Sequence, residues 1–268
     1  MSVRCFYFSV FVFCGLAVFI FASAANAAPL YSVDVLATLP HDRTSFTQGL
    51  LVDGDDFVES SGQYGVSRIV RYSIGEKKPR VVGSLPKEFF AEGVALHRGN
   101  LYLLTWRENR LLVLERHTLK LKEKRRYPDP WMVSEGWGLT SDGKQLMMSD
   151  GTDRILFIDS GNLRLIRTLH VADGNVPVRE LNELEFAEGV LLANIWYRDK
   201  IAGIDPATGK VLFWLDISPL RLKLAKGADV ANGIAWDAQR GKLYVTGKYW
   251  DKTFVIAPLP HIFPGEKR

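Results

Sequence analysis

The stretch Phe90-Ala-Glu-Gly-Val94 leads through the turn His97-Arg-Gly-Asn100 into an alternating run, Leu101-Tyr-Leu-Leu-Thr-Trp106. The same order of a glycine, a polar turn and an apolar strand recurs four more times along the chain. The other copies begin at Phe46-Thr-Gln-Gly-Leu50, Glu135-Gly-Trp-Gly-Leu139, Phe186-Ala-Glu-Gly-Val190 and Ala231-Asn-Gly-Ile-Ala235. Alternation with a period of two residues is the pattern of β-strands, so each copy predicts a small antiparallel unit.

The spacing of these repeats sets the expected architecture. The aligned glycines, Gly49, Gly93, Gly138, Gly189 and Gly233, lie 44, 45, 51 and 44 residues apart. Repeats of about 40 to 50 residues with strand periodicity are typical of β-propeller blades. We therefore predict an all-β, five-bladed β-propeller. Each recurring glycine is expected on an innermost strand, where it lets neighbouring backbones approach closely.

The first 27 residues have the pattern of a secretory signal peptide. They contain no Asp, Glu or Lys, are apolar from Cys5 to Ala22, and end in Ala25-Asn26-Ala27. A retained membrane anchor is the alternative, but the small-residue pattern favours cleavage, which we place after Ala27. Both cysteines of the chain lie in this segment, so the exported protein is expected to have no disulfide. Residues 28–268 are then predicted to form a single propeller domain in the periplasm or outside the cell.

The composition excludes several classes of protein. The formal net charge is only +4, from 34 basic and 30 acidic residues, which does not favour a nucleic-acid partner. With 23 Gly and 12 Pro, the chain is neither collagen-like nor disordered. The 241 residues after the predicted cleavage site divide into five blades of about 48 residues. We expect a monomer that binds neither nucleic acid nor, after cleavage, a membrane.

A propeller brings equivalent positions of all its blades to one end of a central channel. Residues near the recurring glycines should therefore converge there, although they are far apart in sequence. These are Phe46, Gln48, Phe90, Glu92, Trp106, Trp137, Asn182, Trp196 and Lys248. Single aromatic residues at strand ends usually serve as core packing, but a pocket with aromatic walls and a few polar groups is the usual form of a small-ligand site. Aromatic faces also favour a cationic amine.

Eight short motifs follow one another in the order found in a known family. They are Phe46-Thr-Gln-Gly-Leu50, Glu59-Ser-Ser-Gly-Gln-Tyr-Gly65, Leu104-Thr-Trp106, Gly136-Trp-Gly-Leu-Thr140, Leu181-Asn-Glu-Leu-Glu185, Ala193-Asn-Ile-Trp196, Asn232-Gly-Ile-Ala235 and Thr246-Gly-Lys248. In these motifs the chain resembles the glutaminyl-peptide cyclotransferases of the plant and bacterial type, over roughly Tyr31 to Ile256. The resemblance implies a five-bladed propeller, in agreement with the repeat.

The resemblance also implies a reaction and a site. In that family the α-amine of an N-terminal glutamine attacks its own side-chain carboxamide, which releases ammonia and caps the peptide or protein with pyroglutamate. The family's essential carboxylate falls on Glu92, and its other pocket residues fall on the remaining eight positions of the set above. No metal or other cofactor is implied. One departure is Asp129-Pro-Trp-Met-Val-Ser134, which lengthens the usual connection to Glu135 and affects the expected rim of the pocket.

These residue types suit the chemistry. A base must take a proton from the α-ammonium group and the departing nitrogen must receive one, and a single carboxylate can do both. Glu92 is the acidic residue of the set, so we assign it this role, and its aromatic neighbours should raise its pKa. Gln48, Asn182 and Lys248 are the candidate donors to the tetrahedral oxygen, and the sequence does not rank them. The three tryptophans of the set are expected to hold the substrate and exclude water.

Other candidate sites are weaker. The histidines share no repeat position and no zinc-ligand spacing, so no zinc site is expected from His41, His97, His117, His170 and His261. Asp53-Gly-Asp-Asp56 is expected to be a hairpin turn rather than a calcium site. Lys120–Arg126 is expected to be a solvated outer strand. Glu183 and Glu185 alternate with apolar neighbours, so structural pairing and contact with the substrate both remain open, and a structural role is favoured.

Two other functions compete with the leading one. A propeller that binds peptides or sugars without chemistry would use the same aromatic channel, but it has little need for both Glu92 and Lys248. A metal-dependent lactonase of the six-bladed kind would need ligands from several blades and a sixth repeat, which the sequence lacks. The leading hypothesis is an exported, metal-independent glutaminyl-peptide cyclotransferase that acts on peptides or proteins with N-terminal glutamine.

Overall fold

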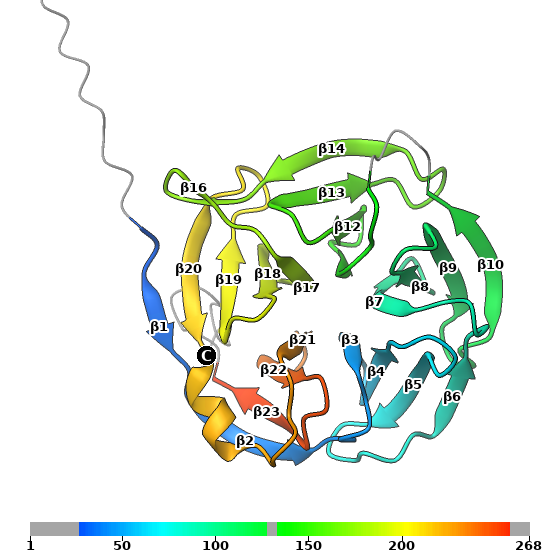
Figure 1. Ribbon diagram of the computed structural model, residues 1–268, viewed down its shortest axis with the longest axis horizontal. Coiled ribbons are helices and arrows are strands. Elements are labelled where there is room, and N and C mark those ends of the chain that lie inside the picture. The colour runs from blue at the N-terminus through cyan, green and yellow to red at the C-terminus, as the bar shows by residue number, and fades with distance from the viewer. Residues whose placement is uncertain (1–26, 128–132, 258–268) are drawn as a thin grey trace, which may run out of the picture.

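The computed structural model describes residues 27–127 and 133–257. Five antiparallel sheets are arranged as blades around a central channel, and the helical structure in these ranges is the short 3-10 helix η2 (Ser218–Lys223) (Figure 1). The prediction of an all-β, five-bladed β-propeller is confirmed.

The first three blades each use four consecutive strands. Blade 1 contains β3 (Thr47–Asp53), β4 (Asp56–Ser61), β5 (Arg68–Ser73) and β6 (Val81–Ser84). Blade 2 contains β7 (Ala91–His97), β8 (Asn100–Thr105), β9 (Arg110–Glu115) and β10 (Leu121–Arg126). Blade 3 contains β11 (Leu139–Ser141), β12 (Leu146–Ser149), β13 (Arg154–Ile158) and β14 (Leu165–His170). In each blade the first strand faces the channel and the fourth lies on the outside.

The last two blades take in strands from the N-terminal part of the chain. Blade 4 contains β17 (Leu181–Ala187), β18 (Val190–Ile195), β19 (Lys200–Ile204) and β20 (Val211–Asp216), with β1 (Leu30–Ser32) added parallel to β20. Blade 5 contains β21 (Ala231–Asp237), β22 (Lys242–Gly247) and β23 (Lys252–Ile256), and β2 (Val35–Pro40) is its outermost strand. A short hairpin, β15 (Ala172–Asp173) and β16 (Val176–Pro177), precedes blade 4. Pairing of β2 with β23 closes the ring.

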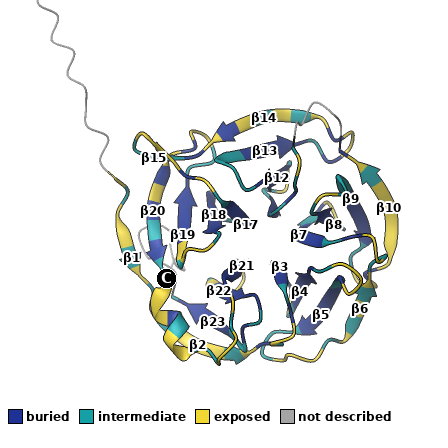
Figure 2. Cartoon of the chain, in the orientation of Figure 1, coloured by how far each residue is buried: buried dark blue, intermediate teal, exposed yellow. Residues whose placement is uncertain are grey.

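The hydrophobic core lies between neighbouring blades rather than in one centre. Five clusters of buried side chains each join two adjacent sheets. Between blades 5 and 1, for example, Tyr244 and Val255 pack against Leu50 and Phe57. Fully burying one such side chain contributes about 1.5–3 kcal/mol, so each interface is a substantial share of the stability. Figure 2 shows the consequence, with buried inner strands and exposed residues concentrated on the outermost strands.

Close approach of the inner strands explains most of the recurring glycines. A Cβ atom at Gly93 would lie 2.3 Å from the backbone nitrogen of Leu139, and one at Gly138 would lie 2.0 Å from the carbonyl oxygen of Asn182. Any side chain at these positions would push neighbouring inner strands apart. Glycine is therefore required here by space and not by the backbone angles.

The assignment of Gly189 to an inner strand is wrong. Gly189 lies in the tight turn between β17 and β18 with φ of +85°, and a Cβ there would meet open space. The inner position of blade 4 is occupied by Glu183, since Leu184 pairs with Ala193 as Val94 pairs with Leu103 in blade 2. A turn and a crowded inner strand both select glycine, and the sequence pattern does not separate the two reasons.

Three smaller predictions have clear outcomes. Gly54, with φ of +67°, forms the turn between β3 and β4, as expected for Asp53–Asp56. Strand β10 is the outermost of blade 2 and mostly exposed, as expected for the basic run. The buried Glu183 carboxylate accepts the backbone N–H of Ile234 at 2.8 Å and that of Leu50 at 3.2 Å, which is a structural role.

Some predictions concern residues outside the described ranges. They are the signal peptide, apart from Ala27, most of the Asp129–Ser134 stretch, and His261. In the ranges that are described, no helix is long and apolar enough to cross a membrane.

Candidate active site

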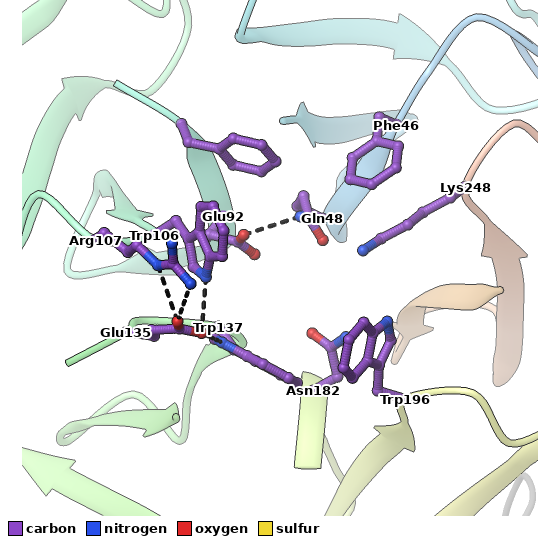
Figure 3. A pocket seen from close by; sticks show the side chains of 11 residues that line it. Phe46, Gln48, Glu92, Trp106, Arg107, Glu135, Trp137, Asn182, Trp196 and Lys248 are labelled. Atoms are coloured by element: carbon purple, nitrogen blue, oxygen red, sulfur yellow. Dashed lines mark hydrogen bonds and ion pairs between the residues drawn. The ribbon is translucent and has the colours of Figure 1, made fainter. Parts of the chain in front are cut away.

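A cavity of about 510 Å³ opens at one end of the channel. All nine residues that the sequence placed in a common pocket line it: Phe46, Gln48, Phe90, Glu92, Trp106, Trp137, Asn182, Trp196 and Lys248. Arg107 and Glu135 complete the lining, and neither was predicted (Figure 3). The walls are mainly aromatic, and the polar groups lie toward the channel.

The floor of the cavity comes from the same position of different blades. Gln48, Glu92 and Asn182 are each the second residue of an inner strand, namely β3, β7 and β17. Asn232 holds this position in β21 and was missed as a site residue. A signal was present in the sequence, because Asn232 precedes Gly233 as Gln48 precedes Gly49.

The walls come from the ends of the second strands. Because each inner hairpin is antiparallel, β8, β18 and β22 end on the face where the inner strands begin. The first residues after these strands are Trp106, Trp196 and Lys248, and all three reach the cavity. By pairing register, the equivalent positions in blades 1 and 3 are glycines: Gly62, directly after β4, and Gly151, two residues after β12.

These two glycines make room for aromatic rings from elsewhere. A Cβ at Gly62 would lie 2.3 Å from Cε1 of Phe90, and a Cβ at Gly151 would lie 2.7 Å from Cζ2 of Trp137. Both rings therefore pack directly on backbone. Blade 1 thus supplies the backbone of Gly62 as a support for the Phe90 ring, and blade 3 supplies the backbone of Gly151 as a support for the Trp137 ring.

The aromatic rings support one another. Phe90 packs against Phe46 with ring centroids 6.1 Å apart and against Trp106 at 5.3 Å. On the other side, Trp137 and Trp196 meet edge to face at 5.3 Å. Edge contacts of this kind fix ring orientation beyond what burial alone provides. The cavity thus has firm apolar walls before any ligand enters.

Glu92 is held by a chain of amides on the cavity floor. Its Oε1 accepts a hydrogen bond from Nε2 of Gln48 at 2.9 Å. The other end of the Gln48 amide, Oε1, accepts from Nδ2 of Asn232 at 2.9 Å, and the same Nδ2 donates to the carbonyl of Thr47. Asn232 thereby fixes which end of the Gln48 amide faces Glu92.

The environment of Glu92 disfavours its charged form. Only 4% of the residue is exposed, and burial raises its pKa well above the ordinary value. The Lys248 ammonium acts in the opposite direction, while the negative charges of Glu135 and Glu108 raise the pKa further. Glu92 is therefore a carboxyl group whose affinity for a proton is increased, as a proton shuttle requires.

Lys248 is the buried cation of the site. It is 6% exposed, and its Nζ lies 4.3 Å from the centroid of the Phe46 ring. Burial lowers the pKa of Lys248, and the charges of Glu92 and Asp229 partly offset that effect. A cation held against an aromatic face is restricted in position while its donors stay available to the cavity.

Asn182 brings an unused acceptor to the cavity. Its Oδ1 is buried and has no hydrogen-bond partner among the described residues. Figure 3 shows the side chain directed into the cavity from β17. Leaving a buried acceptor without a donor costs about 1–3 kcal/mol, so a ligand N–H at this place would remove a penalty.

Glu135 joins the two tryptophans on one side of the cavity. Its Oε2 accepts hydrogen bonds from Nε1 of Trp106 at 2.8 Å and from Nε1 of Trp137 at 2.9 Å. Its Oε1 accepts two from the Arg107 guanidinium, at 2.8 and 2.9 Å. Glu135 begins the repeated motif Glu135-Gly-Trp-Gly-Leu139, but its partners are set by contacts between blades, which local sequence does not reveal.

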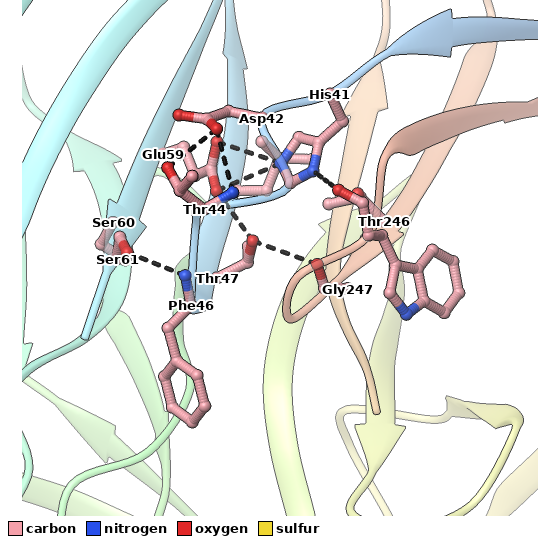
Figure 4. Close-up of polar contacts among 12 residues, drawn as sticks. His41, Asp42, Thr44, Phe46, Thr47, Glu59, Ser60, Ser61, Thr246 and Gly247 are labelled. Carbon is pink, nitrogen blue, oxygen red and sulfur yellow. Dashed lines mark hydrogen bonds and ion pairs between the residues drawn. The ribbon is translucent and has the colours of Figure 1, made fainter. Parts of the chain in front are cut away.

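A buried polar network supports the opposite side (Figure 4). The Glu59 carboxylate accepts hydrogen bonds from Thr47 at 2.8 Å and Tyr72 at 2.9 Å, and it pairs with His41 Nε2 at 3.2 Å. Thr47 also donates to the carbonyl of Gly247 at 3.4 Å. Since Thr47 precedes Gln48 and Gly247 precedes Lys248, the network fixes the two strands that carry these cavity residues.

The contacts of the Glu59–His41 pair favour its charged form. Burial lowers the pKa of His41, but the Glu59 carboxylate and a hydrogen bond to the Trp250 carbonyl outweigh burial and raise it. Burial raises the pKa of Glu59, but His41, Thr47 and Tyr72 outweigh it and lower the pKa.

The described histidines are dispersed. His97 lies between the hydroxyls of Ser141 and Ser160, and His170 pairs with Asp153 at 2.9 Å. Within residues 27–127 and 133–257, no group of three or more His, Cys, Asp or Glu side chains is arranged to hold a metal ion.

Comparison with known proteins identifies the family of the chain. The sequence model of the glutamine cyclotransferase family matches residues 10–257. The chain is 36% identical over 230 residues to a glutaminyl-peptide cyclotransferase of Arabidopsis thaliana, which covers 84% of this chain and 70% of that protein. It superimposes on the crystal structure of Myxococcus xanthus glutaminyl cyclase with a TM-score of 0.78 and 32% identity, over 85% of this chain and 97% of that one. The chain belongs to the glutamine cyclotransferase family.

Proposed function

We propose that this protein converts the N-terminal glutamine of peptides or proteins into pyroglutamate and releases ammonia, with Glu92 as the proton shuttle. The observation that carries the proposal is a buried carboxyl group, fixed by Gln48, at the floor of an aromatic cavity. Family membership and the 36% identity to a glutaminyl-peptide cyclotransferase support the reaction class.

In the first step, the Glu92 carboxylate takes a proton from the α-ammonium group of the substrate. The neutral amine then attacks the δ-carbon of its own carboxamide and forms the new C–N bond. The raised pKa of Glu92 suits this step, because a carboxylate in a dry cavity is a stronger base than one in water. The Oδ1 atom of Asn182, which has no partner in the described protein, suits an N–H of the substrate.

In the second step, Glu92 gives its proton to the carboxamide nitrogen and removes the remaining extra proton from the former amine. The old C–N bond breaks and ammonia departs. Glu92 passes this second proton to the ammonia, which leaves as ammonium, and Glu92 is again a carboxylate. The tetrahedral oxygen carries negative charge in between and needs a donor. Gln48 uses Nε2 to hold Glu92, so we assign this role to the Lys248 ammonium.

The aromatic walls favour ring closure over hydrolysis. The attacking α-amine and the attacked δ-carbon belong to one residue, so the main task is to hold its side chain folded back toward the amine. Trp106, Trp137 and Trp196 line the cavity, and their rings would exclude water from the substrate once it is bound. Exclusion of water also protects the tetrahedral intermediate from competing attack.

We further propose that the protein is exported. The support is the N-terminal sequence, with its apolar run from Cys5 to Ala22 and the small residues before the cleavage site after Ala27. Mass spectrometry of the mature N-terminus tests this. An N-terminus at Ala28 is expected, and retention of Met1 would overturn it.

A direct assay tests the function. The purified protein is incubated with a Gln-initiated peptide in the presence of excess chelator, and the products are followed by mass spectrometry and an ammonia assay. A mass loss equal to one ammonia, in step with ammonia release, is expected. Folded protein that binds the peptide but releases no ammonia would instead be a binding propeller, and dependence on an added metal ion would overturn the proposed mechanism.

A further inference from the structure

Glu135 is a charged residue in the cavity wall to which the mechanism above gives no role. Its side chain is 22% exposed, yet both carboxylate oxygens are fully used. One oxygen accepts both indole N–H groups, and the other accepts the Arg107 guanidinium. Glu135 lies three residues before the recurring glycine of blade 3, and the residues at this place in blades 1 and 2 are Phe46 and Phe90.

The contacts of Glu135 join two blades. Trp106 belongs to the end of β8 in blade 2, and Trp137 precedes β11 in blade 3. A single oxygen at 2.8 and 2.9 Å from the two Nε1 atoms fixes the angle between the rings. Each ring then contacts a further wall residue, Phe90 for Trp106 and Trp196 for Trp137. The orientation set at Glu135 therefore extends to most of the aromatic wall.

Arg107 completes the arrangement from the solvent side. Its guanidinium binds Glu135 through two nitrogens and lies 3.7 Å from the centre of the Trp106 ring. Burial raises the pKa of Glu135, but the hydrogen bonds from Trp137, Trp106 and Arg107 outweigh it, so the carboxylate stays charged. A charged acceptor forms stronger hydrogen bonds than a neutral one.

We propose that Glu135 is a positioning residue, which locks the indoles of Trp106 and Trp137 in the orientation that holds the substrate's glutamine folded for ring closure. This inference rests on the proposed function for the identity of the ligand. Glu135 acts through the two tryptophans and takes no proton from the substrate.

Two substitutions separate the anchoring of the indoles from the charge. Glu135→Leu removes the acceptor, and Glu135→Gln keeps an oxygen for the indoles without the charge. A displacement of about 1 Å can cost about 100-fold in rate, so Glu135→Leu should lower kcat/KM by about 10- to 100-fold, mostly in kcat. Glu135→Gln should stay within about threefold of wild type at its own optimum pH.

The charge has a separate signature in the pH profile. The charged groups that act on Glu92 are Lys248, Glu135 and Glu108. Removal of the negative charge in Glu135→Gln should lower the pKa of Glu92 and move the acidic limb of kcat/KM to lower pH. A residue with a purely structural role would leave that limb in place.

Asp173→Leu is the matched control. Asp173 accepts the Nε1 hydrogen bond of Trp214 at 2.9 Å, at the outer edge of blade 4 and outside the cavity lining. The Asp173→Leu substitution removes a carboxylate–indole hydrogen bond of the same kind as those of Glu135. We expect a change in near-ultraviolet circular dichroism in both leucine variants, but a loss of kcat only at position 135.

A double-mutant cycle tests the route of action. In a Trp106→Phe, Trp137→Phe background the indole donors are absent, so Glu135→Leu should cost several-fold less than in wild type. Equal cost in both backgrounds would overturn the proposal, as would kcat/KM of Glu135→Leu within twofold of wild type. Affinity for the pyroglutamyl product peptide, measured by calorimetry, gives a second reading in the same cycle. If wild type releases no ammonia, the proposed function fails. Calorimetry with a Gln-initiated peptide as the ligand then tests the positioning role in the same cycle, and an equal loss of affinity on Glu135→Leu in both backgrounds would overturn it.

Discussion

Nε2 of Gln48 donates a hydrogen bond to Oε1 of Glu92 at 2.9 Å, and this contact joins the floors of blades 1 and 2. The amide of Gln48 cannot turn round without losing its bond from Asn232 to Oε1. This hydrogen bond occupies Oε1 of Glu92, and in the proposed mechanism Oε2 faces the substrate. It also means that the catalytic proposal depends on three inner strands together.

Glu92→Gln should abolish turnover and keep the fold. Loss of a general acid–base group lowers the rate by about 10²- to 10⁴-fold. Burial already disfavours the charged carboxylate, so a neutral amide of the same shape should leave the melting temperature equal or higher. Steady-state kinetics and thermal unfolding measure the two effects. More than a tenth of wild-type kcat would contradict the shuttle role.

Asn232→Leu should impair catalysis at a distance from the substrate. The change removes the donor that orients Gln48, so we expect roughly a tenfold lower kcat, together with a loss of about 1–3 kcal/mol in stability from unpaired buried groups. Asn194→Leu is the control, since Asn194 is equally buried and accepts the N–H of Gly233 but does not touch Gln48. A similar loss of kcat in both variants would mean that destabilisation alone is responsible.

Lys248→Met should move the acidic limb of the pH profile upward. The Lys248 charge lowers the pKa of Glu92, so its removal raises that pKa, and Glu92 then loses its proton only at higher pH. Methionine keeps an apolar contact with Phe46. The profile of kcat/KM against pH measures the shift. A limb that stays in place or moves to lower pH would refute the electrostatic coupling.

Gly151→Ala should disturb Trp137. The new Cβ would lie 2.7 Å from the indole, at a residue whose φ is +77°. Gly189→Ala is a matched control, with φ of +85° and open space around its Cβ. The left-handed conformation costs about 1–2 kcal/mol in both variants. Only Gly151→Ala should lower kcat/KM, and intrinsic fluorescence should report the moved tryptophan. Equal kinetics in the two variants would show that the indole adapts without cost.

His41→Gln should remove stability over a defined pH range. The pKa of His41 is raised above 6.5, so its contribution is complete below pH 6.5 and is lost as pH rises through the higher folded value. The pKa of Glu59 is lowered below 4.5, so its contribution is complete above pH 4.5 and is lost at more acidic pH. The stability difference from wild type should therefore be greatest between pH 4.5 and 6.5.

Breaking such a buried pair costs about 3–5 kcal/mol. Denaturant unfolding at several pH values measures the difference. A loss that is constant from pH 4 to pH 9 would show that the pair is not ionised.

The recurring glycines predicted the number of blades but not every residue of the inner strands. Three of them lie on inner strands and Gly138 lies directly before one, at places where a side chain would be crowded, and this was enough to count the blades. In the fourth copy the prediction for Gly189 was wrong, because Glu183 occupies the inner-strand position of that blade. The Glu183 carboxylate accepts two backbone N–H groups across the channel, and no local pattern distinguishes such a residue from a strand glutamate on the surface.

The sequence by itself determined the number of blades and nine residues of the cavity lining, because a repeat of fixed length maps equal positions in the chain to equal positions around an axis. Only the tertiary structure decided the closure of the ring by β2, the orientation of Gln48 by Asn232 and the anchoring of two indoles by Glu135. Each of these depends on hydrogen bonds between separate strands or blades. Their geometry follows from how the sheets pack, and the hydrophobic periodicity of a single strand does not predict contacts with other strands.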